Sequence, residues 1–386
     1  MQNIKLLNKI SKCGTDELCP KTYCVGDDVD SPVGILVRSA AMHDMEMPET
    51  LLGIARAGAG VNNIPIAKCT DAGVVVFNTP GANANAVKEL VICGLMLSAR
   101  NIIGGIEWAR GLDFDVAKTV EKGKGQFAGH EISGKTLGVI GLGAIGGLVA
   151  NTAIHLGMNV IGCDPYLSVD AAWNLNHHVE RAASYDEIYE SADYITFHIP
   201  ATETTKGIIN TENIAKMRDG VKILNFSRSE LACEDDVIAV IESGKISAYV
   251  TDFPTEKMIG VKGVVAIPHL GASTEESEDN CARMAAIQLD DYIRNGNIKN
   301  SVNFPAMSMP KSTGYRVCVL HKNVPAMISK IAQSLSEHGI NIEHMMNKSR
   351  GDVAYSMFDV CGEVPDVVVC DINAIDGVIR GRFIIQ

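Results

Sequence analysis

The segment that most constrains what this chain can fold into runs from Thr136 to Ala150 and reads TLGVIGLGAIGGLVA. Its apolar start, residues 137–140, predicts a short strand that is buried on both faces. Three glycines follow in a G-x-G-x-x-G pattern, and an apolar helical pattern then continues to Leu156. A strand, a glycine turn and a helix in this order predict a parallel α/β sheet that binds a dinucleotide at the turn. A glycine turn without a ligand is the alternative.

Each glycine of the turn has its own physical role in such a site. Gly141 allows the tight turn, Gly143 lets the main chain approach a pyrophosphate, and Gly146 allows the helix to pack closely on the strand. The helix then begins near Ala144 and Ile145, where free amide groups and a partial positive charge face the phosphates. These five positions are the predicted phosphate contacts.

The residue at the end of the next strand predicts which dinucleotide binds. That strand, residues 159–163, is followed by Asp164. A carboxylate at this place can accept hydrogen bonds from both ribose hydroxyls and would repel a 2′-phosphate. The sequence therefore predicts NAD rather than NADP as the cofactor.

Composition narrows the class of protein further. A length of 386 residues predicts two or three domains, and a net charge of −12 without a run of Lys or Arg argues against a nucleic-acid partner. We recognise no signal peptide and no stretch of membrane-spanning length, so no membrane association is expected. The eleven cysteines form no C-x-x-C pair, which predicts reduced thiols and a cytoplasmic location. Cys13, Cys19 and Cys24 cluster, but without a histidine among them no metal site is expected.

Apolar runs alternate with helical patterns along most of the chain, which predicts doubly wound α/β architecture. A small α/β unit, residues 33–77, precedes the glycine turn. A helix from about 84 to 109 is apolar on nearly every side, so it is either an internal core helix or a helix between subunits, and we favour the second. The strands expected from the turn onward are 137–141, 159–163, 194–199, 221–226, 247–251 and 264–267.

Three ionisable residues directly follow or lie shortly after successive strands of this sheet: Arg228, Glu256 and His269. Ligands bind beyond the carboxyl ends of such strands, so these side chains are expected at the dinucleotide. Oxidising a secondary alcohol by hydride transfer needs a base for the hydroxyl proton and a group that fixes the substrate. Histidine suits the first task, a carboxylate behind it would fix its tautomer, and arginine can grip a carboxylate with two hydrogen bonds. Each residue alone could equally be structural.

The chain at this point resembles the D-2-hydroxyacid dehydrogenase family, and within it the branch that acts on 3-phospho-D-glycerate. The resemblance implies that Arg228 binds the substrate's carboxylate and carbonyl oxygen and that His269 and Glu256 handle the proton. It also implies cofactor contacts at Ser227 and Asp252. The runs that carry the resemblance are 36–39, 56–63, 78–80, 138–147, 225–228, 252–256 and 268–274.

The resemblance implies a domain order that the sequence alone does not give. A flavodoxin-like substrate domain is expected in two segments, with a Rossmann-type NAD domain inserted between them and a smaller α+β domain at the end. The expected ranges are 1–82 and 273–305 for the substrate domain, 83–272 for the NAD domain, 306–313 for a linker and 314–386 for the tail. Pairing through the NAD domains is usual in the family, so a homodimer or homotetramer is expected.

The same resemblance implies NAD-dependent oxidation of 3-phospho-D-glycerate to 3-phosphohydroxypyruvate, the first step of serine biosynthesis. A phosphorylated substrate requires further cations, and Arg38, Arg56 and Arg100 stand where the branch carries basic residues toward the phosphate. Arg100 could instead form a helix-surface ion pair. The other substrate contacts expected are Ser39, Ala57, Gly58 and Asn78. Another D-2-hydroxyacid dehydrogenase, such as a glyoxylate or hydroxypyruvate reductase, and a non-catalytic NAD-sensing corepressor are the alternatives.

The last part of the chain, from Gly314, predicts a β-α-β-β-α-β order, as in a ferredoxin-like sandwich. It resembles an ACT domain, a regulatory module that binds amino acids at paired interfaces. His321, Asn323 and Asn341 match positions that contact serine in dehydrogenases inhibited by their end product, so L-serine is the expected effector. The same polar side chains could simply cap a loop and a helix end.

Overall fold

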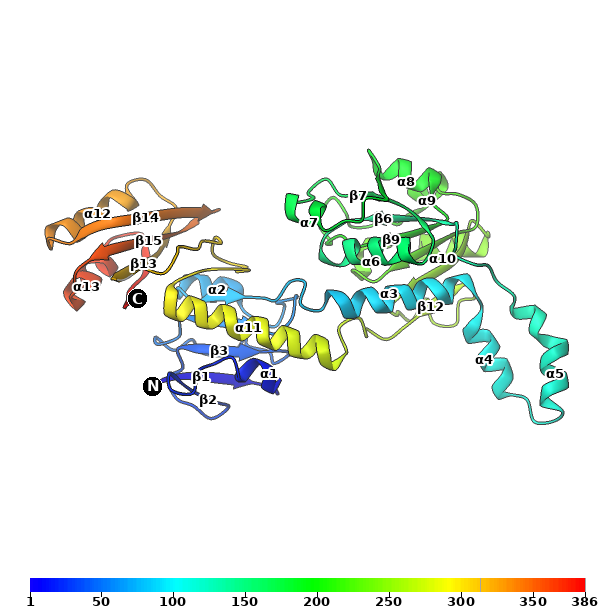
Figure 1. Ribbon diagram of the computed structural model, residues 1–386, viewed down its shortest axis with the longest axis horizontal. Helices are drawn as coiled ribbons and strands as arrows, with labels where there is room; N and C mark the ends of the chain where they lie inside the picture. Colours follow the sequence, from blue (N-terminus) through cyan, green and yellow to red (C-terminus); the bar gives the residue numbers. More distant parts are fainter. Residues whose placement is uncertain (313, 386) are drawn as a thin grey trace. The chain divides into compact units, whose positions relative to one another are not determined.

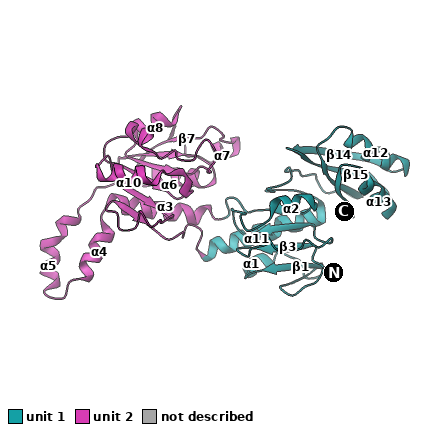
Figure 2. Cartoon of the chain, turned by 180° about the vertical axis from the view of Figure 1, so that it is seen from behind, with its two compact units in different colours: residues 1–82, 275–386 teal, residues 83–274 magenta. Residues whose placement is uncertain are grey.

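The computed structural model describes residues 1–312 and 314–385, and it divides the chain into two compact units. One unit contains Met1–Ala82 and Glu275–Gln386, and the other contains Asn83–Thr274 (Figure 2). The first unit is therefore built from both ends of the chain. Residues 313 and 386, the last of the expected linker and of the expected tail domain, lie outside the described residues.

The first unit contains a five-stranded parallel sheet with the strand order β2-β1-β3-β4-β5. This is the flavodoxin-like order, which confirms the predicted fold class of the substrate domain. The register pairs Val37 with Arg56 and Ala55 with Phe77, so the carboxyl ends of three strands meet at one edge. The strands are β1 (Gln2–Leu7), β2 (Tyr23–Gly26), β3 (Gly34–Val37), β4 (Gly53–Arg56) and β5 (Val75–Phe77).

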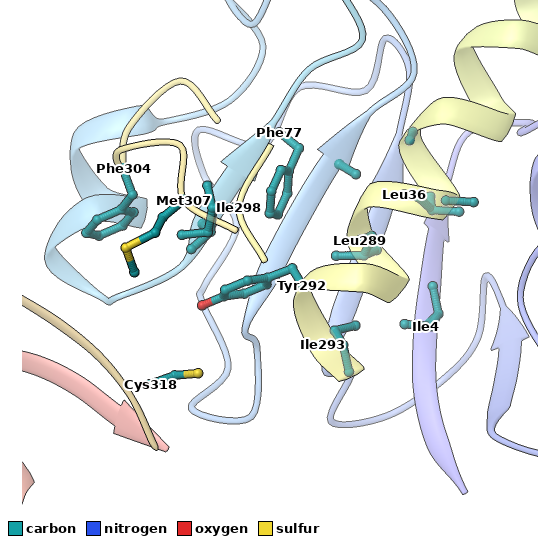
Figure 3. Close-up of a cluster of buried hydrophobic side chains, with 14 of the residues drawn as sticks. Ile4, Leu36, Phe77, Leu289, Tyr292, Ile293, Ile298, Phe304, Met307 and Cys318 are labelled. Carbon is teal, nitrogen blue, oxygen red and sulfur yellow. The ribbon is translucent and has the colours of Figure 1, made fainter. Parts of the chain in front are cut away.

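Helix α11 (Glu275–Asn295) covers one face of this sheet although it follows the second unit in sequence. Its residues Leu289, Tyr292 and Ile293 are buried against Ile4 and Phe77 (Figure 3). The opposite face of the sheet has a separate core, which includes residues of α2 (Ile66–Asp71). A short helix, α1 (Lys12–Thr15), also packs on α11.

The second unit contains a seven-stranded parallel sheet with the strand order β12-β11-β10-β9-β6-β7-β8. This is the doubly wound Rossmann order, with β12 as an added strand at one edge, and it confirms the predicted fold class. Strand β8 (Val179–Arg181) was not expected, because three mostly exposed residues carry no apolar run. The other strands are β6 (Thr136–Ile140), β7 (Asn159–Cys163), β9 (Tyr194–Phe197), β10 (Val221–Asn225), β11 (Ile246–Thr251) and β12 (Val264–Ala266).

The register of this sheet places the predicted site residues along one edge. Ile140 pairs with both Cys163 and Phe197, and Asn225 pairs with Phe197 and Thr251. The residues that directly follow these strand ends therefore share the carboxyl edge of the sheet. The helices of the unit are α6 (Ala144–His155), α7 (Val169–Trp173), α8 (Tyr185–Ser191), α9 (Thr211–Lys216), η2 (Ser229–Leu231) and α10 (Glu234–Glu242), besides those described next.

The single helix expected from 84 to 109 is wrong. The chain instead forms α3 (Ala84–Ala99) and α4 (Ile102–Arg110), which are bent by 72° at the break. Arg100 has an extended backbone, and the Asn101 side chain caps α4 by accepting a hydrogen bond from the Gly104 amide at 3.1 Å. The residues on both sides of Arg100 and Asn101 are mostly apolar, so the hydrophobic pattern alone did not indicate a break at these two polar residues.

Helix α3 buries one face within its own unit, and Val87, Val91 and Leu95 belong to the core beside β6 and β10. Helices α4 and α5 (Val116–Gly123), with the short η1 (Lys124–Phe127), have no fully buried residue. They form an arm that projects from the sheet of the unit (Figure 1). Among the described residues no single helix is long and apolar enough to cross a membrane, and only the bent pair α3 and α4 together meet that length and composition.

The tail forms a four-stranded antiparallel sheet with the order β14-β15-β13-β16, the order of a ferredoxin-like sandwich. Helices α12 (Met327–Glu337) and α13 (Asp366–Ala374) share a core with one face of this sheet. The other face joins the core around α11. The strands are β13 (Tyr315–Lys322), β14 (Asn341–Arg350), β15 (Val353–Cys361) and β16 (Val378–Ile385).

Candidate active site

The glycine turn after β6 has the geometry that the sequence predicted. Gly141 has a φ of +90°, and a Cβ there would lie 2.5 Å from the main-chain oxygen of His198. A Cβ at Gly146 would overlap the carbonyl oxygen of Gly141. Gly143, which precedes the first residue of α6, Ala144, has open space around its Cβ position. The turn is thus closed on the protein side and open at Gly143, which fits a phosphate group approaching the helix N-terminus.

Asp164 lies beside this turn and is fixed by the main chain. Its Oδ2 accepts a hydrogen bond from the Leu142 amide at 2.9 Å, and its Oδ1 accepts one from the Tyr166 amide at 2.9 Å. Each carboxylate oxygen keeps a further acceptor site, because an ionised carboxylate offers about four. The carboxylate can therefore still accept from ribose hydroxyls. Ile145, in the first turn of α6, is half-buried.

The loop after β10 is shaped by Asn225, which is fully buried. Its amide nitrogen donates to the Arg228 carbonyl at 2.9 Å and to the Tyr249 hydroxyl at 3.1 Å, and its Oδ1 accepts from the Ser227 amide at 3.3 Å. Arg228 itself is exposed, and its Nη1 donates to the Ser227 carbonyl at 2.6 Å. The buried amide thus fixes the loop, and the guanidinium remains available to a ligand.

Asp252, directly after β11, is buried, and its Oδ1 has no hydrogen-bond partner among the described residues. Burial raises the pKa of this carboxyl group, and the nearby His269 and Arg228 oppose that rise. His269 is exposed, and its ring packs edge-on against Phe253 with centroids 4.9 Å apart. The structure therefore brings Arg228 and His269 together around one buried carboxylate. Phe253 was not identified from the sequence as a residue of this site. Its position next to Asp252 was the only feature of the sequence that could have indicated its contact with His269.

Glu256 lies in the exposed loop after β11. Within the part of the chain that the structure describes, it makes no hydrogen bond or ion pair with His269. The tautomer-fixing pair between these two residues therefore stays a prediction. The preceding residue, Thr255, anchors this loop, because its hydroxyl donates a hydrogen bond to the Glu234 carboxylate at the start of α10.

The residues expected to bind the substrate lie mostly in the first unit, at the carboxyl ends of β3, β4 and β5. Arg56 Nε donates to the Arg38 carbonyl at 3.0 Å, and its guanidinium packs against Gly58. Burial lowers the pKa of Arg56. Ala57 is buried and donates its amide to the Val37 carbonyl at 2.8 Å. Arg56 is therefore positioned by the loop that carries Arg38.

Arg38 forms an ion pair with Glu278 of α11, with 2.6 Å between Nη2 and Oε1. Both side chains are about two-fifths exposed, so the pair contributes at most about 1 kcal/mol to stability and matters for position. Glu278 was missed, because nothing in the sequence of a helical first turn indicates a partner so far away in the chain. The Ser39 amide donates to Asn8 Oδ1 at 3.1 Å.

Asn78 follows β5, and its side chain donates to the Ala59 carbonyl at 2.6 Å. Arg100 belongs to the other unit, where it is exposed between α3 and α4. It lines a cavity of about 420 Å³ with Trp108 and Phe127 of the arm. The structure thus brings Arg38, Arg56 and Asn78 into one unit and leaves Arg100 in another.

The three expected effector residues are not together within one chain. His321 is buried near the end of β13, with Nδ1 2.8 Å from the Lys322 carbonyl and Nε2 2.9 Å from the Ser356 hydroxyl. Asn323 lies two residues further on and donates to the Gly351 carbonyl at 3.0 Å. Asn341 begins β14 at the other end of the sheet.

The distance between the two ends follows from the register of β15. Asn341 pairs with Cys361, and His321 pairs with Ala354. Seven strand residues separate these partners, which corresponds to roughly 23 Å. One amino acid cannot contact His321 and Asn341 of the same chain.

Comparison with known proteins agrees with this geometry. Residues 93–271 match the model of the NAD-binding domain of the D-isomer-specific 2-hydroxyacid dehydrogenases. The D-3-phosphoglycerate dehydrogenase of Methanocaldococcus jannaschii is 35% identical over 273 residues, which are 69% of this chain and 50% of that protein. A relative in Schizosaccharomyces pombe is 30% identical over 349 residues, 83% of this chain and 71% of that protein.

A solved structure, the NAD⁺-bound 3-phosphoglycerate dehydrogenase of Entamoeba histolytica, is 29% identical with a TM-score of 0.61. The match covers 78% of this chain and 98% of that one. The chain spans only about half the length of the archaeal relative.

Proposed function

This chain belongs to the D-isomer-specific 2-hydroxyacid dehydrogenase family, and from that premise we propose that it oxidises 3-phospho-D-glycerate to 3-phosphohydroxypyruvate with NAD. The observation that carries the proposal is the group formed by Arg228, His269 and the buried Asp252. This group follows strands of the same sheet whose glycine turn is open at Gly143. The names of the similar proteins support phosphoglycerate as the substrate.

The chemistry assigns one task to each side chain. Arg228 binds the substrate's carboxylate and polarises the oxygen that becomes a carbonyl. His269 accepts the proton of the hydroxyl group as the alcohol is oxidised. NAD bound at the glycine turn would supply the hydride acceptor for this oxidation. Glu256 is the proposed carboxylate that stabilises the protonated imidazole.

Two arginines suit the phosphate group. Arg56 is held by the Arg38 carbonyl, and the Arg38 side chain remains about two-fifths exposed although it pairs with Glu278. A phosphate placed between two guanidinium groups gains charge-assisted hydrogen bonds that an unphosphorylated hydroxy acid cannot form. Arg100, in the other unit, is proposed as a third phosphate contact, supplied by a second subunit.

One assay tests the proposed activity. Purified protein is incubated with NAD and 3-phospho-D-glycerate at alkaline pH with a trap for the oxo product, and NADH is followed by absorbance. NADH formation that requires the phosphate group is expected. Turnover of glyoxylate or hydroxypyruvate without a phosphate preference would instead assign a reductase of the same family. Tight NADH binding without turnover of any hydroxy acid would assign a non-catalytic sensor.

L-serine is the proposed effector of the tail. Because His321 and Asn341 are roughly 23 Å apart in one sheet, serine would contact both only between the sheets of two chains. Strand β14 is suited to such pairing, since it is an edge strand and most of its residues are exposed. Inhibition requires that serine bind one quaternary state better than another.

We propose a homodimer that forms through the arm of the second unit. The arm exposes large apolar side chains that a monomer would leave in water: Ile102, Ile103, Ile106, Phe114 and Val116. Light scattering of the wild type and of an Ile106→Asp variant tests this, with a lower mass expected for the variant. A tetramer would require the tail sheets to pair as well. The cytoplasm is the proposed location, because all eleven cysteines are free thiols.

A further inference from the structure

The last turn of α11 is held by an arginine of the C-terminal sheet. Arg382, on β16, donates from Nη1 to the Ile293 carbonyl at 2.9 Å and from Nη2 to the Tyr292 carbonyl at 2.5 Å. Its guanidinium also stacks on the Tyr292 ring, 4.6 Å from the centroid. The last four carbonyls of a helix have no partner inside the helix. Arg382 therefore supplies a donor to the Ile293 carbonyl and a second donor to the Tyr292 carbonyl, which also accepts from the Gly296 amide at 2.9 Å.

Two further side chains of the sheet hold the residues at the end of the helix. Arg316 is fully buried, is fixed by Asp359 at 2.6 and 3.0 Å, and donates to the Asn295 carbonyl at 2.8 Å. The Tyr355 hydroxyl donates to the Gly296 carbonyl at 2.7 Å. Four carbonyl acceptors near the helix end, those of Tyr292, Ile293, Asn295 and Gly296, are thus bound to one sheet.

The contact between the sheet and the helix is a packed core rather than a polar bridge. Cys318 of the sheet lies in the same buried cluster as Tyr292 and Phe304 (Figure 3). Tyr355 and Met357 of the sheet belong to this cluster as well. Loosening the sheet from the helix would expose these side chains to water. The sheet and the helix therefore move together.

Residues further back on the same helix contact the proposed substrate residues. The Gln288 side chain, which is buried, donates to the Asn78 carbonyl at 2.8 Å. Glu278, in the first turn, pairs with Arg38. A helix of 21 residues is a rigid element of roughly 31 Å, so a shift at its last turn is transmitted to both contacts.

We infer that the C-terminal sheet positions the substrate residues Arg38 and Asn78 through α11. The inference rests on the proposed function, which assigns Arg38 to the substrate, and on the substrate contact expected of Asn78. A shift of the tail sheet then moves α11 and changes the affinity for the phosphorylated hydroxy acid. It leaves NADH binding unchanged, since the glycine turn belongs to residues 83–274.

An Arg382→Met variant of the full-length chain tests this inference, because methionine keeps the apolar contact with Tyr292 and removes the two donors. We expect KM for 3-phospho-D-glycerate to rise at least fivefold, while kcat and the Kd of NADH, measured by fluorescence, change less than twofold. Arg382→Lys, which retains a donor, should recover part of the loss. Lys330→Met, on the exposed face of α12, is the matched control for a lost positive charge and should behave as the wild type.

Amide hydrogen exchange gives a second readout that does not depend on turnover. In Arg382→Met, the amides of Asn78 and Thr79 should exchange faster, since their hydrogen bonds to the Asn300 and Gly58 carbonyls lie beside the loosened helix. An unchanged KM together with unchanged exchange at these amides would overturn the inference. If the wild type does not oxidise 3-phospho-D-glycerate, the proposed function fails, and the exchange experiment still decides whether the sheet positions Asn78.

A milder variant covers the case in which Arg382→Met does not fold. Tyr355→Phe removes one hydrogen bond to the helix end and keeps the ring in the core. A rise in KM of about twofold, again without a change in NADH affinity, supports the inference. A folded Tyr355→Phe protein with wild-type KM and wild-type exchange at Asn78 overturns it.

Discussion

Two adjacent glycines at the start of α6 should respond in opposite directions to the same substitution. A Cβ at Gly146 would fall well inside 3.0 Å of the Gly141 carbonyl oxygen, which belongs to the main chain and cannot rotate away. A Cβ at Gly147 would meet its nearest neighbour, the Leu142 carbonyl oxygen, at 3.5 Å, an ordinary contact. Gly146→Ala therefore forces the turn and the helix apart, whereas Gly147→Ala does not.

The size of the effect follows from these distances. A carbon normally lies ~3.3 Å or more from a carbonyl oxygen, so Gly146→Ala must move the helix or the turn by roughly 1.4 Å. Overpacking of this kind costs about 3 kcal/mol, of which the better helix propensity of alanine offsets about 1 kcal/mol. For a unit of this size, a net loss of about 2 kcal/mol lowers Tm by about 4–8 °C. Gly147→Ala should raise Tm by about 1–4 °C, because only the propensity term remains.

Calorimetry of the full-length variants and NADH titration by fluorescence measure both effects. Gly146→Ala should also weaken NADH binding at least tenfold, about 1.4 kcal/mol, since the displaced turn carries the amides that face the pyrophosphate. Gly143→Ala separates folding from binding, because its Cβ meets no protein atom: Tm should change little while NADH affinity falls. A Gly146→Ala protein that melts no lower than the wild type and binds NADH normally would refute the steric argument.

Four further outcomes follow from the site. Burial lowers the pKa of His198 to about 4, below its unfolded value of 6.5, so the unfolded state gains a proton first as the pH falls. Stability should then drop by about 2–3 kcal/mol between pH 6.5 and 4, and His198→Gln should flatten this dependence in denaturant titrations. His269→Asn should reduce kcat about 100-fold or more while leaving NADH affinity within twofold, and an active variant would remove His269 as the base. Arg56→Ala should raise KM more for the phosphorylated substrate than for an unphosphorylated hydroxy acid, and equal effects would argue against a phosphate contact. Asn341→Ala should abolish inhibition by millimolar serine and leave turnover without serine unchanged. A wild-type protein that serine does not inhibit would contradict the proposal that serine is the effector of the tail.

The predictions that succeeded rest on local sequence patterns. The apolar run at 137–140 and the three glycines predict one turn almost completely, because steric demands within a few residues determine it. Asp164 and Arg228 were placed correctly at strand ends for the same reason. By contrast, β1 and β2 carry mixed, half-exposed side chains, and β8 has only three residues. Their existence depends on neighbouring strands that are distant in sequence.

The parts of the site that could not be predicted depend on contacts between distant segments. Glu278 reaches Arg38 only because α11 returns to a sheet that was completed before residue 83. Arg316 and Arg382 resembled ordinary charged strand residues, yet each donates to carbonyls near the end of α11. An arginine in a strand gives no indication of which carbonyl it will contact.

The discontinuous first unit also has a consequence for synthesis on the ribosome. Strands β1 to β5 emerge early, but α11, which covers one of their faces with Leu289 and Tyr292, is made only after residues 83–274. At about 5–20 residues per second, the interval is roughly 10–40 s. During that time the nascent chain carries an uncovered apolar sheet while the inserted unit is already free to fold. Chains that terminate before residue 275 should therefore aggregate through the first sheet and engage chaperones, even though their dinucleotide-binding unit is complete.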